Sequence, residues 1–182
     1  MRGAVLAALF SLPSLALTTP GFAVGTMTDA PPTPTATTTD CAEGTVWDET
    51  LEKCVAPKES RLDDDGLYEA ARELAYAGRL DTAGSVLSAM SDQSDDRVLT
   101  YRGFIARQMG DIAAAEAFYL SALAKNPGNL LARSYMGQGL VAEGRIDEAY
   151  AQLVEIRRRG GADSWPAQAL DTAIRSGVTT SY

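Results

Sequence analysis

The chain has 182 residues, a length that fits one domain with appendages, and 24 acidic against 16 basic side chains give it a formal net charge of −8. This negative charge argues against nucleic acid or an anionic membrane surface as the main partner. The sequence contains no histidine and only two cysteines. Catalytic sets and metal sites that need histidine, and four-cysteine zinc sites, are therefore excluded, and we expect no metal and no cofactor.

Residues 1–23 have the pattern of a secretory signal peptide. Arg2 precedes an apolar stretch that Pro13 interrupts, and Gly21 and Ala23 are small residues suited to a cleavage site. The alternative is an uncleaved N-terminal membrane anchor, although the apolar stretch is short for a transmembrane helix. Because no cysteine lies near this site for lipid attachment, we expect a periplasmic or secreted protein of the bacterial cell envelope, with no integral membrane segment after cleavage.

The next segment, residues 24–40, is rich in threonine and proline. Positions 26–39 alone hold seven threonines and three prolines. Such a composition buries too little apolar surface to offset the entropy that ordering would cost. We therefore predict a disordered, flexible linker here, semi-extended at Pro31 and Pro32.

A small loop follows over residues 41–57, with Cys41 near its start and Cys54 near its end. An even number of cysteines downstream of a signal peptide favours a disulfide between them. Residues 45–47 and 53–55 contain β-forming side chains on either side of a polar turn, which predicts a small hairpin. We expect a disulfide-closed structural clip.

The spacing of Cys41, Gly44, Trp47 and Cys54 resembles the last hairpin of small cysteine-rich sugar-binding modules of the chitin-binding type. That resemblance implies an alternative role for this loop, in which Trp47 is a recognition residue that stacks on a sugar. Redox catalysis is disfavoured, because the two cysteines do not form a Cys-x-x-Cys motif.

The rest of the chain, residues 62–182, contains one sequence unit that is repeated three times. Its turn glycines are Gly78, Gly110 and Gly144, at spacings of 32 and then 34 residues. A small residue stands seven positions before each glycine, an alanine five positions after it and a larger side chain nine positions after it. The small residues are Ala71, Gly103 and Gly137, and the alanines are Ala83, Ala115 and Ala149. The larger side chains are Leu87, Tyr119 and Leu153. A glycine ends a helix where φ must be positive, and small residues let two helices approach closely, so each unit predicts a helix hairpin.

This pattern resembles the tetratricopeptide repeat family, with units at about 64–95, 96–129 and 130–162. The resemblance implies an all-α fold, a right-handed superhelical stack of three helix hairpins. Departures are Arg133, where a large apolar residue is usual, and Asp95 and Gly161, where proline is usual. Residues 163–176 predict a capping helix that starts with Asp163-Ser164-Trp165-Pro166, with Pro166 in its first turn.

The family resemblance further implies a concave groove lined by the first helix of each hairpin. The candidate groove residues are Tyr68, Arg72, Tyr76, Arg97, Thr100, Phe104, Arg107, Gln108, Ser134 and Gln138. Arginines and aromatic residues dominate binding hot spots, whereas the alternative is a solvated helix face with ordinary packing aromatics. Tyr68 and Arg72 stand where the family's carboxylate-binding groove has Lys and Asn, so that mode of recognition is not predicted.

Two charge runs fit helix ends. Residues 63–65 are three aspartates that suit the start of a helix, and residues 157–159 are three arginines that suit the end of one; docking of an acidic surface is the alternative for the arginines. The sequence has no histidine and no phosphate-binding glycine loop, so we predict a non-enzymatic scaffold that binds a protein or peptide. The alternative is a cell-envelope carbohydrate-binding protein that uses the Cys41–Cys54 loop and Trp47.

Overall fold

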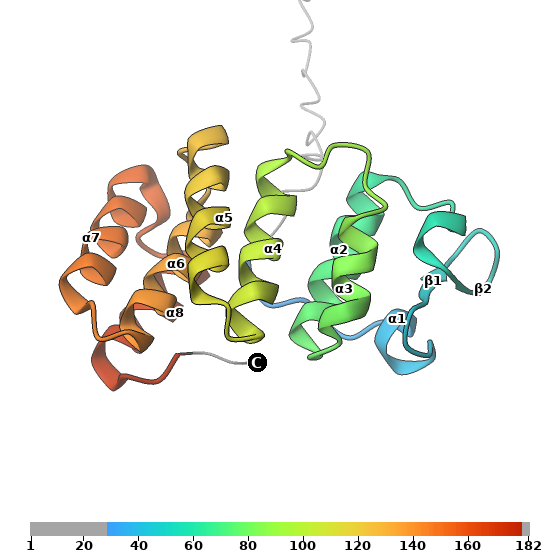
Figure 1. The fold of residues 1–182 in the computed structure, drawn as a ribbon, viewed down its shortest axis with the longest axis horizontal. Coiled ribbons are helices and arrows are strands. Elements are labelled where there is room, and N and C mark those ends of the chain that lie inside the picture. Colours follow the sequence, from blue (N-terminus) through green and yellow to red (C-terminus); the bar gives the residue numbers. More distant parts are fainter. Residues whose placement is uncertain (1–28, 180–182) are drawn as a thin grey trace, which may run out of the picture.

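The computed structural model describes residues 29–179, in which helices predominate (Figure 1). The predicted signal peptide lies outside the described residues. Three helix hairpins follow one another, and an eighth helix packs on the third hairpin. They are α2 (Asp64–Tyr76) with α3 (Leu80–Leu87), α4 (Asp96–Gln108) with α5 (Ile112–Lys125), α6 (Leu130–Ala142) with α7 (Ile146–Ile156), and finally α8 (Trp165–Ser176).

The turns between paired helices have the conformation that the sequence predicts. Gly78, Gly110 and Gly144 have φ angles of 76°, 86° and 76°, in the left-handed region that glycine adopts without strain. Side chains cap the starts of several helices: Asp63 accepts a hydrogen bond from the backbone of Gly66, and Ser164 from that of Ala167. The hairpin boundaries are therefore set by local backbone chemistry.

The small residues of the repeats stand where helices touch. A Cβ atom added to Gly103 would lie 2.6 Å from the ring of Tyr119, and one added to Gly137 would lie 2.7 Å from Leu170. Both glycines are buried, so the close approach of the helices depends on the missing side chain. Of the described helices, none combines the length and the apolar character that crossing a membrane requires.

The C-terminal cap is α8, as predicted. It packs on α6 and α7, and Leu170 and Ala173 on its inner side are fully buried. The three arginines before it begin the π-helical turn Arg157–Gly161, which follows α7. Arg157 pairs with Asp171 of α8 at 3.0 Å, and Arg158 pairs with Glu155 of α7 at 2.7 Å. Arg157 and Arg158 therefore form ion pairs with acidic side chains of this chain.

The N-terminal cap consists of residues 36–59: α1 (Ala36–Thr39), strands β1 (Val46–Asp48) and β2 (Lys53–Val55), and a 3-10 helix over Pro57–Glu59. The strands pair antiparallel with Trp47 opposite Cys54, and a disulfide joins Cys41 to Cys54. Val46 is fully buried in the same core cluster as Leu67 of α2. The predicted clip and hairpin are thus present, and they close the first end of the helical stack.

Polar contacts hold this cap to the first hairpin. Thr82 of α3 accepts a hydrogen bond from the backbone of Gly44 at 2.9 Å and donates one to Glu43 at 2.6 Å. Arg79 donates to Glu43 at 2.8 Å and to the carbonyl oxygens of Thr37 and Cys41 at 3.1 and 3.0 Å. The Thr82 hydrogen bond lowers the pKa of Glu43, with a further contribution from Arg79.

The disordered linker predicted for residues 24–40 is wrong for the part that the structure describes. Residues 29–35, which we call the N-terminal segment, cross α2, and α1 follows them. These residues carry little apolar surface, but their polar groups find partners far along the chain. Arg72 and Glu73 of α2 supply these partners.

Candidate functional site

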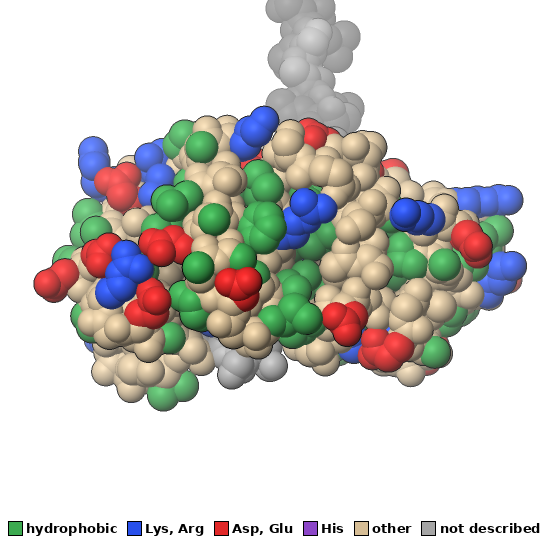
Figure 2. All heavy atoms as spheres, viewed as in Figure 1, with side chains coloured by type: hydrophobic (Ala, Val, Ile, Leu, Met, Phe, Trp, Pro, Cys, Tyr) green, Lys and Arg blue, Asp and Glu red, His purple; other side chains and the backbone are tan. Residues whose placement is uncertain are grey.

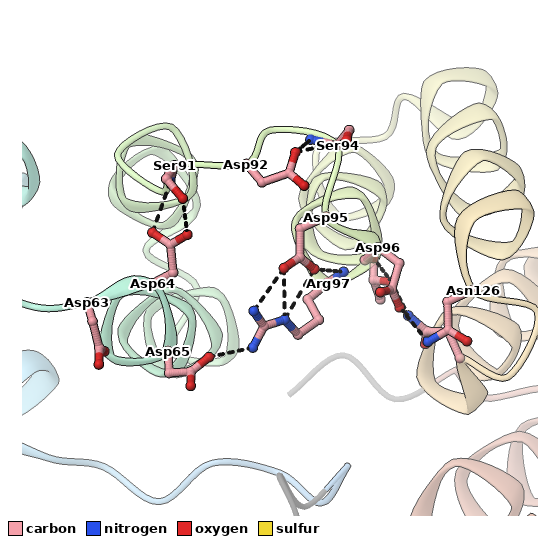
Figure 3. Close-up of polar contacts among 12 residues, drawn as sticks. Asp63, Asp64, Asp65, Ser91, Asp92, Ser94, Asp95, Asp96, Arg97 and Asn126 are labelled. Atoms are coloured by element: carbon pink, nitrogen blue, oxygen red, sulfur yellow. Dashed lines mark hydrogen bonds and ion pairs between the residues drawn. The ribbon is translucent and has the colours of Figure 1, made fainter.

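The candidate site lies on the face of α2 and α4 that points away from α3, which we call the groove face. The guanidinium carbon of Arg97 lies 5.0 Å from the ring centroid of Tyr68, and that of Arg72 lies 5.6 Å from the same centroid. Arg97 also pairs with Asp65 and Asp95, each at 2.8 Å (Figure 3). The three side chains pack together, and the two cations gain from the face of the tyrosine ring. Tyr68 and Arg72 are buried, at 5 % and 3 % exposed, so of these three residues Arg97 is the one that reaches the surface.

The aspartates at the helix starts tie neighbouring elements together (Figure 3). Asp64 accepts hydrogen bonds from the backbone and side chain of Ser91, and these bonds lower the pKa of its carboxyl group. Asp96 accepts hydrogen bonds from the side-chain amides of Asn126 at 3.0 Å and Asn129 at 2.6 Å. These carboxylates therefore have structural partners.

Beneath the groove face, aromatic rings form a continuous ladder from α2 to α8. Tyr101 lies between Tyr68 and Tyr135, with centroid distances of 5.6 and 6.0 Å, and Trp165 lies 6.5 Å beyond Tyr135. Sequence reasoning missed Tyr101, Tyr135 and Trp165. A signal existed, because Tyr101 and Tyr135 each stand two positions before the small residue of their repeat.

The second hairpin contributes less to the surface than predicted. Thr100 and Phe104 are buried, which corrects their assignment to the groove lining. Thr100 donates a hydrogen bond to the carbonyl oxygen of Asp96 and accepts one from Asn129, and Phe104 stacks on Tyr76. Both side chains are buried because α6 packs on α4.

Ser134 and Gln138 are also wrong as groove residues, since both are fully buried. Ser134 donates a hydrogen bond to the carbonyl oxygen of Pro166 at 2.8 Å, and Gln138 donates one to Ser134 at 3.3 Å. Because α8 packs against α6, it covers the face that a following repeat would otherwise occupy. Ser134 therefore joins the third hairpin to the C-terminal cap, and Gln138 supports Ser134 from within α6.

Two other predicted residues are half-buried at the far end of α4, Arg107 and Gln108. The guanidinium carbon of Arg107 lies 5.6 Å from the ring centroid of Phe104. The same residue lines a small cavity with Tyr119 and Met136, between the second and third hairpins. Arg107 therefore does not share the Tyr68 ring with Arg72 and Arg97.

Two hollows adjoin the N-terminal segment. One, of about 180 Å³, is lined by Asp29, Tyr68, Arg97, Asn126 and Asn129 among others. The other, of about 260 Å³, lies between residues 31–35 and the side chains of Glu69, Arg72 and Glu73. Burial raises the pKa of Asp29 and the neighbouring Arg72 opposes that rise, so a carboxylate at this place relies on the arginine. The groove face thus combines a cationic and aromatic centre with recesses on either side.

The opposite face, which carries α3 and α5, has a different character (Figure 2). Apolar side chains stand exposed there, with Leu120 of α5 53 % and Met109 60 % exposed. In the N-terminal cap, Trp47 is half-buried, and its backbone donates a hydrogen bond to Thr37 at 3.3 Å. A recognition role for Trp47 stays a prediction.

Comparison with known proteins gives one match. The sequence model of the tetratricopeptide repeat family matches residues 106–170, from the last turn of α4 into α8. No curated protein and no solved structure matches the chain. The matched region covers about a third of the sequence and includes α5, α6 and α7, and the hairpin of α2 and α3 repeats its glycine and alanine positions. This part of the chain is therefore similar to the tetratricopeptide repeat family.

Proposed function

We propose that this chain is a non-enzymatic scaffold of the bacterial cell envelope that binds a protein or peptide through its groove face. Tetratricopeptide repeats generally mediate interactions between proteins and are typically non-catalytic. The envelope location draws on the signal-peptide pattern of residues 1–23. The disulfide between Cys41 and Cys54 agrees with it, since such bonds persist in oxidising compartments.

One observation supports the groove face above the rest of the surface. Arg97 lies over the ring of Tyr68 beside a hollow that Asn126 and Asn129 also line. Arginine and tyrosine are enriched among the residues that carry binding energy, and side-chain amides can bind both the donors and the acceptors of a peptide backbone. This combination suits an extended peptide better than it suits a small apolar ligand.

Site-directed photo-crosslinking tests the proposal. A photoreactive residue is placed at position 126, on the exposed rim of the hollow, or at position 120, on the opposite face. Each full-length variant is expressed in the cell envelope and irradiated. We expect a discrete adduct from position 126 and none from position 120, because a groove-bound partner contacts only the former.

A charge reversal serves as the matched control for the same experiment. Arg97→Glu in the position-126 variant should abolish the adduct, whereas Arg175→Glu, on the exposed side of α8, should leave it unchanged. Adducts from position 120 alone, or an adduct that survives Arg97→Glu, would place the binding surface elsewhere.

A further inference from the structure

The groove face already holds a peptide, the protein's own N-terminal segment. In Figure 3 this segment passes α2 on the side that faces away from α3. The sequence of residues 29–35 is Asp-Ala-Pro-Pro-Thr-Pro-Thr, and it leads directly into α1. The contacts that hold it show what kind of peptide this surface accepts.

Glu73 anchors the end of the segment. Its carboxylate accepts hydrogen bonds from the backbone and the hydroxyl of Thr35, both at 2.7 Å, and from the backbone of Thr38 at 3.1 Å. The hydroxyl of Thr38 donates a fourth hydrogen bond to it. Glu73 is only 6 % exposed. A carboxylate so buried needs such donors, and hydrogen bonds to a charged acceptor are stronger than neutral ones.

Arg72 holds the start of the segment. Its side chain is 3 % exposed and donates to both carboxylate oxygens of Glu69, at 2.9 and 2.8 Å. Its other terminal nitrogen donates to the carbonyl oxygen of Ala30. A backbone carbonyl is present in every peptide, so this contact selects an extended chain and does not select a sequence.

The stretch between these two anchors is largely exposed and rich in proline. Pro31, Pro32 and Pro34 favour an extended conformation and carry no backbone N–H that would need a partner. Pro31, Thr33, Pro34 and Thr35 are exposed. The large core cluster includes Val46 of the N-terminal cap but no member of residues 29–35. Polar contacts with the buried side chains of Arg72 and Glu73 therefore hold the segment, and a chain of the same chemistry can replace it.

We propose that Glu69, Arg72 and Glu73 form a recognition site for a proline-containing peptide that runs extended past Arg72 and ends in a helical turn, with one hydroxyl side chain at the start of that turn and a second three positions later. Residues 29–38, which are the N-terminal segment and the first turn of α1, occupy this site as an internal competitor until a partner segment of the same chemistry displaces them. This inference rests on the proposed function, because it names the class of peptide that the groove face binds.

Binding of a synthetic peptide tests the proposal. The probe is a fluorescent peptide of residues 29–40, and its affinity for full-length variants is measured by anisotropy. Thr35→Ala with Thr38→Ala removes two hydroxyl donors to Glu73 from the internal segment and leaves the site itself intact. We expect this release variant to bind the probe at least tenfold more tightly than the native chain, whose site is occupied.

Two controls define the site. Thr33→Ala changes an exposed threonine of the same segment that lies outside the Glu73 contacts, so it should bind the probe as weakly as the native chain does. Glu73→Gln added to the release variant should remove the gained affinity, because it takes away the charged acceptor. Equal affinity for native and release variants, no binding by either, or binding that persists after Glu73→Gln would overturn the proposal.

The experiment also separates this proposal from the one on which it rests. If the segment were only a structural strap, the release variant would lose stability, measured by thermal unfolding, without gaining affinity for the probe. A partner adduct from position 126 together with no gain in probe binding would overturn the internal competitor alone. The expected probe binding without any adduct would overturn the scaffold function and retain the peptide site.

Discussion

The C-terminal end of the helical stack is closed by α8, which continues the packing of the repeats with buried side chains such as Leu170 and Ala173. The N-terminal end is closed by α1 and a disulfide-linked hairpin, which insert Val46 into the core and also rely on polar contacts, among them those of Arg79 and Thr82. An end of a repeat stack must cover its apolar face, and these caps show two ways to do so. The first depends on shape, whereas the second also depends on redox state, hydrogen bonds and pH.

Loss of apolar contact in the C-terminal cap should have the largest effect. Leu170→Ala removes a fully buried side chain that fills the space left by Gly137, and such truncations typically cost about 2–5 kcal/mol of unfolding free energy. Denaturation by urea measures the change. Val178→Ala, at a position 67 % exposed, is the control and should stay within about 0.5 kcal/mol of the native value. Equal effects of the two substitutions would contradict the apolar account of this cap.

Removal of the disulfide should come next and should act on the opposite end. Cys41→Ser with Cys54→Ser opens a loop with a sequence separation of 13, which is worth about 3 kcal/mol in the chain-entropy model. Each cap contains one tryptophan, Trp47 at the N-terminal end and Trp165 at the C-terminal end. In a Trp165→Phe background, fluorescence therefore reports on the N-terminal cap, and in a Trp47→Phe background it reports on the C-terminal cap. We expect the Trp47 signal to change at a lower urea concentration than before, with a smaller shift for Trp165. The same shift at both tryptophans would show that the disulfide does not act locally.

A smaller effect should follow from the polar contacts of the N-terminal cap. Thr82→Val keeps the shape of the side chain but removes the acceptor for Gly44 and the donor to Glu43. The expected loss is about 1–2 kcal/mol, from roughly 1 kcal/mol for each hydrogen bond. Urea denaturation of this variant is compared with that of Ser85→Ala, on the exposed side of α3, which should change stability little. If the Thr82 variant were as stable as the control, the hydrogen bonds of Thr82 would not stabilise the N-terminal cap.

The smallest effect concerns pH. The backbone N–H of Arg61 lowers the pKa of Asp48, and the hydroxyl of Thr82 lowers that of Glu43. Because the native values are lowered, the stabilisation is complete above the ordinary pKa values of about 4. It is then lost as the pH falls through the lowered native values. The Trp47 signal should therefore report cap opening in mild urea near pH 3 and none at pH 7, whereas Asp48→Asn should reduce this pH dependence.

The hairpins were predictable from sequence because their constraints are local. A glycine with positive φ and a small residue at a helix contact leave the same mark in every repeat, as Gly110 and Gly103 show. The contact of Arg97 with Tyr68 was also predictable, because both stand on first helices of neighbouring hairpins.

The errors have a shared physical origin in contacts that are distant in the sequence. Ser134 was assigned to the surface because no residue close to it in the sequence indicates that α8 covers it. The N-terminal segment was assigned to disorder because its main partner, Glu73, stands 38 residues beyond Thr35. Burial and polar pairing depend on what the chain brings together later, and composition does not reveal this.

The hydroxyl groups of three tyrosines link the three hairpins and affect how the molecule unfolds. In a linear stack each repeat usually contacts only its neighbours, so the ends can fray one repeat at a time. Here the hydroxyl of Tyr76 in the first hairpin lies 2.7 Å from that of Tyr135 in the third, and Tyr101 of the second lies 3.4 Å from the same oxygen. If any one of the three hairpins unfolds, at least one hydrogen bond between Tyr135 and a tyrosine of another hairpin is lost. We expect the three hairpins to unfold together in a single cooperative transition, with no stable intermediate of two repeats.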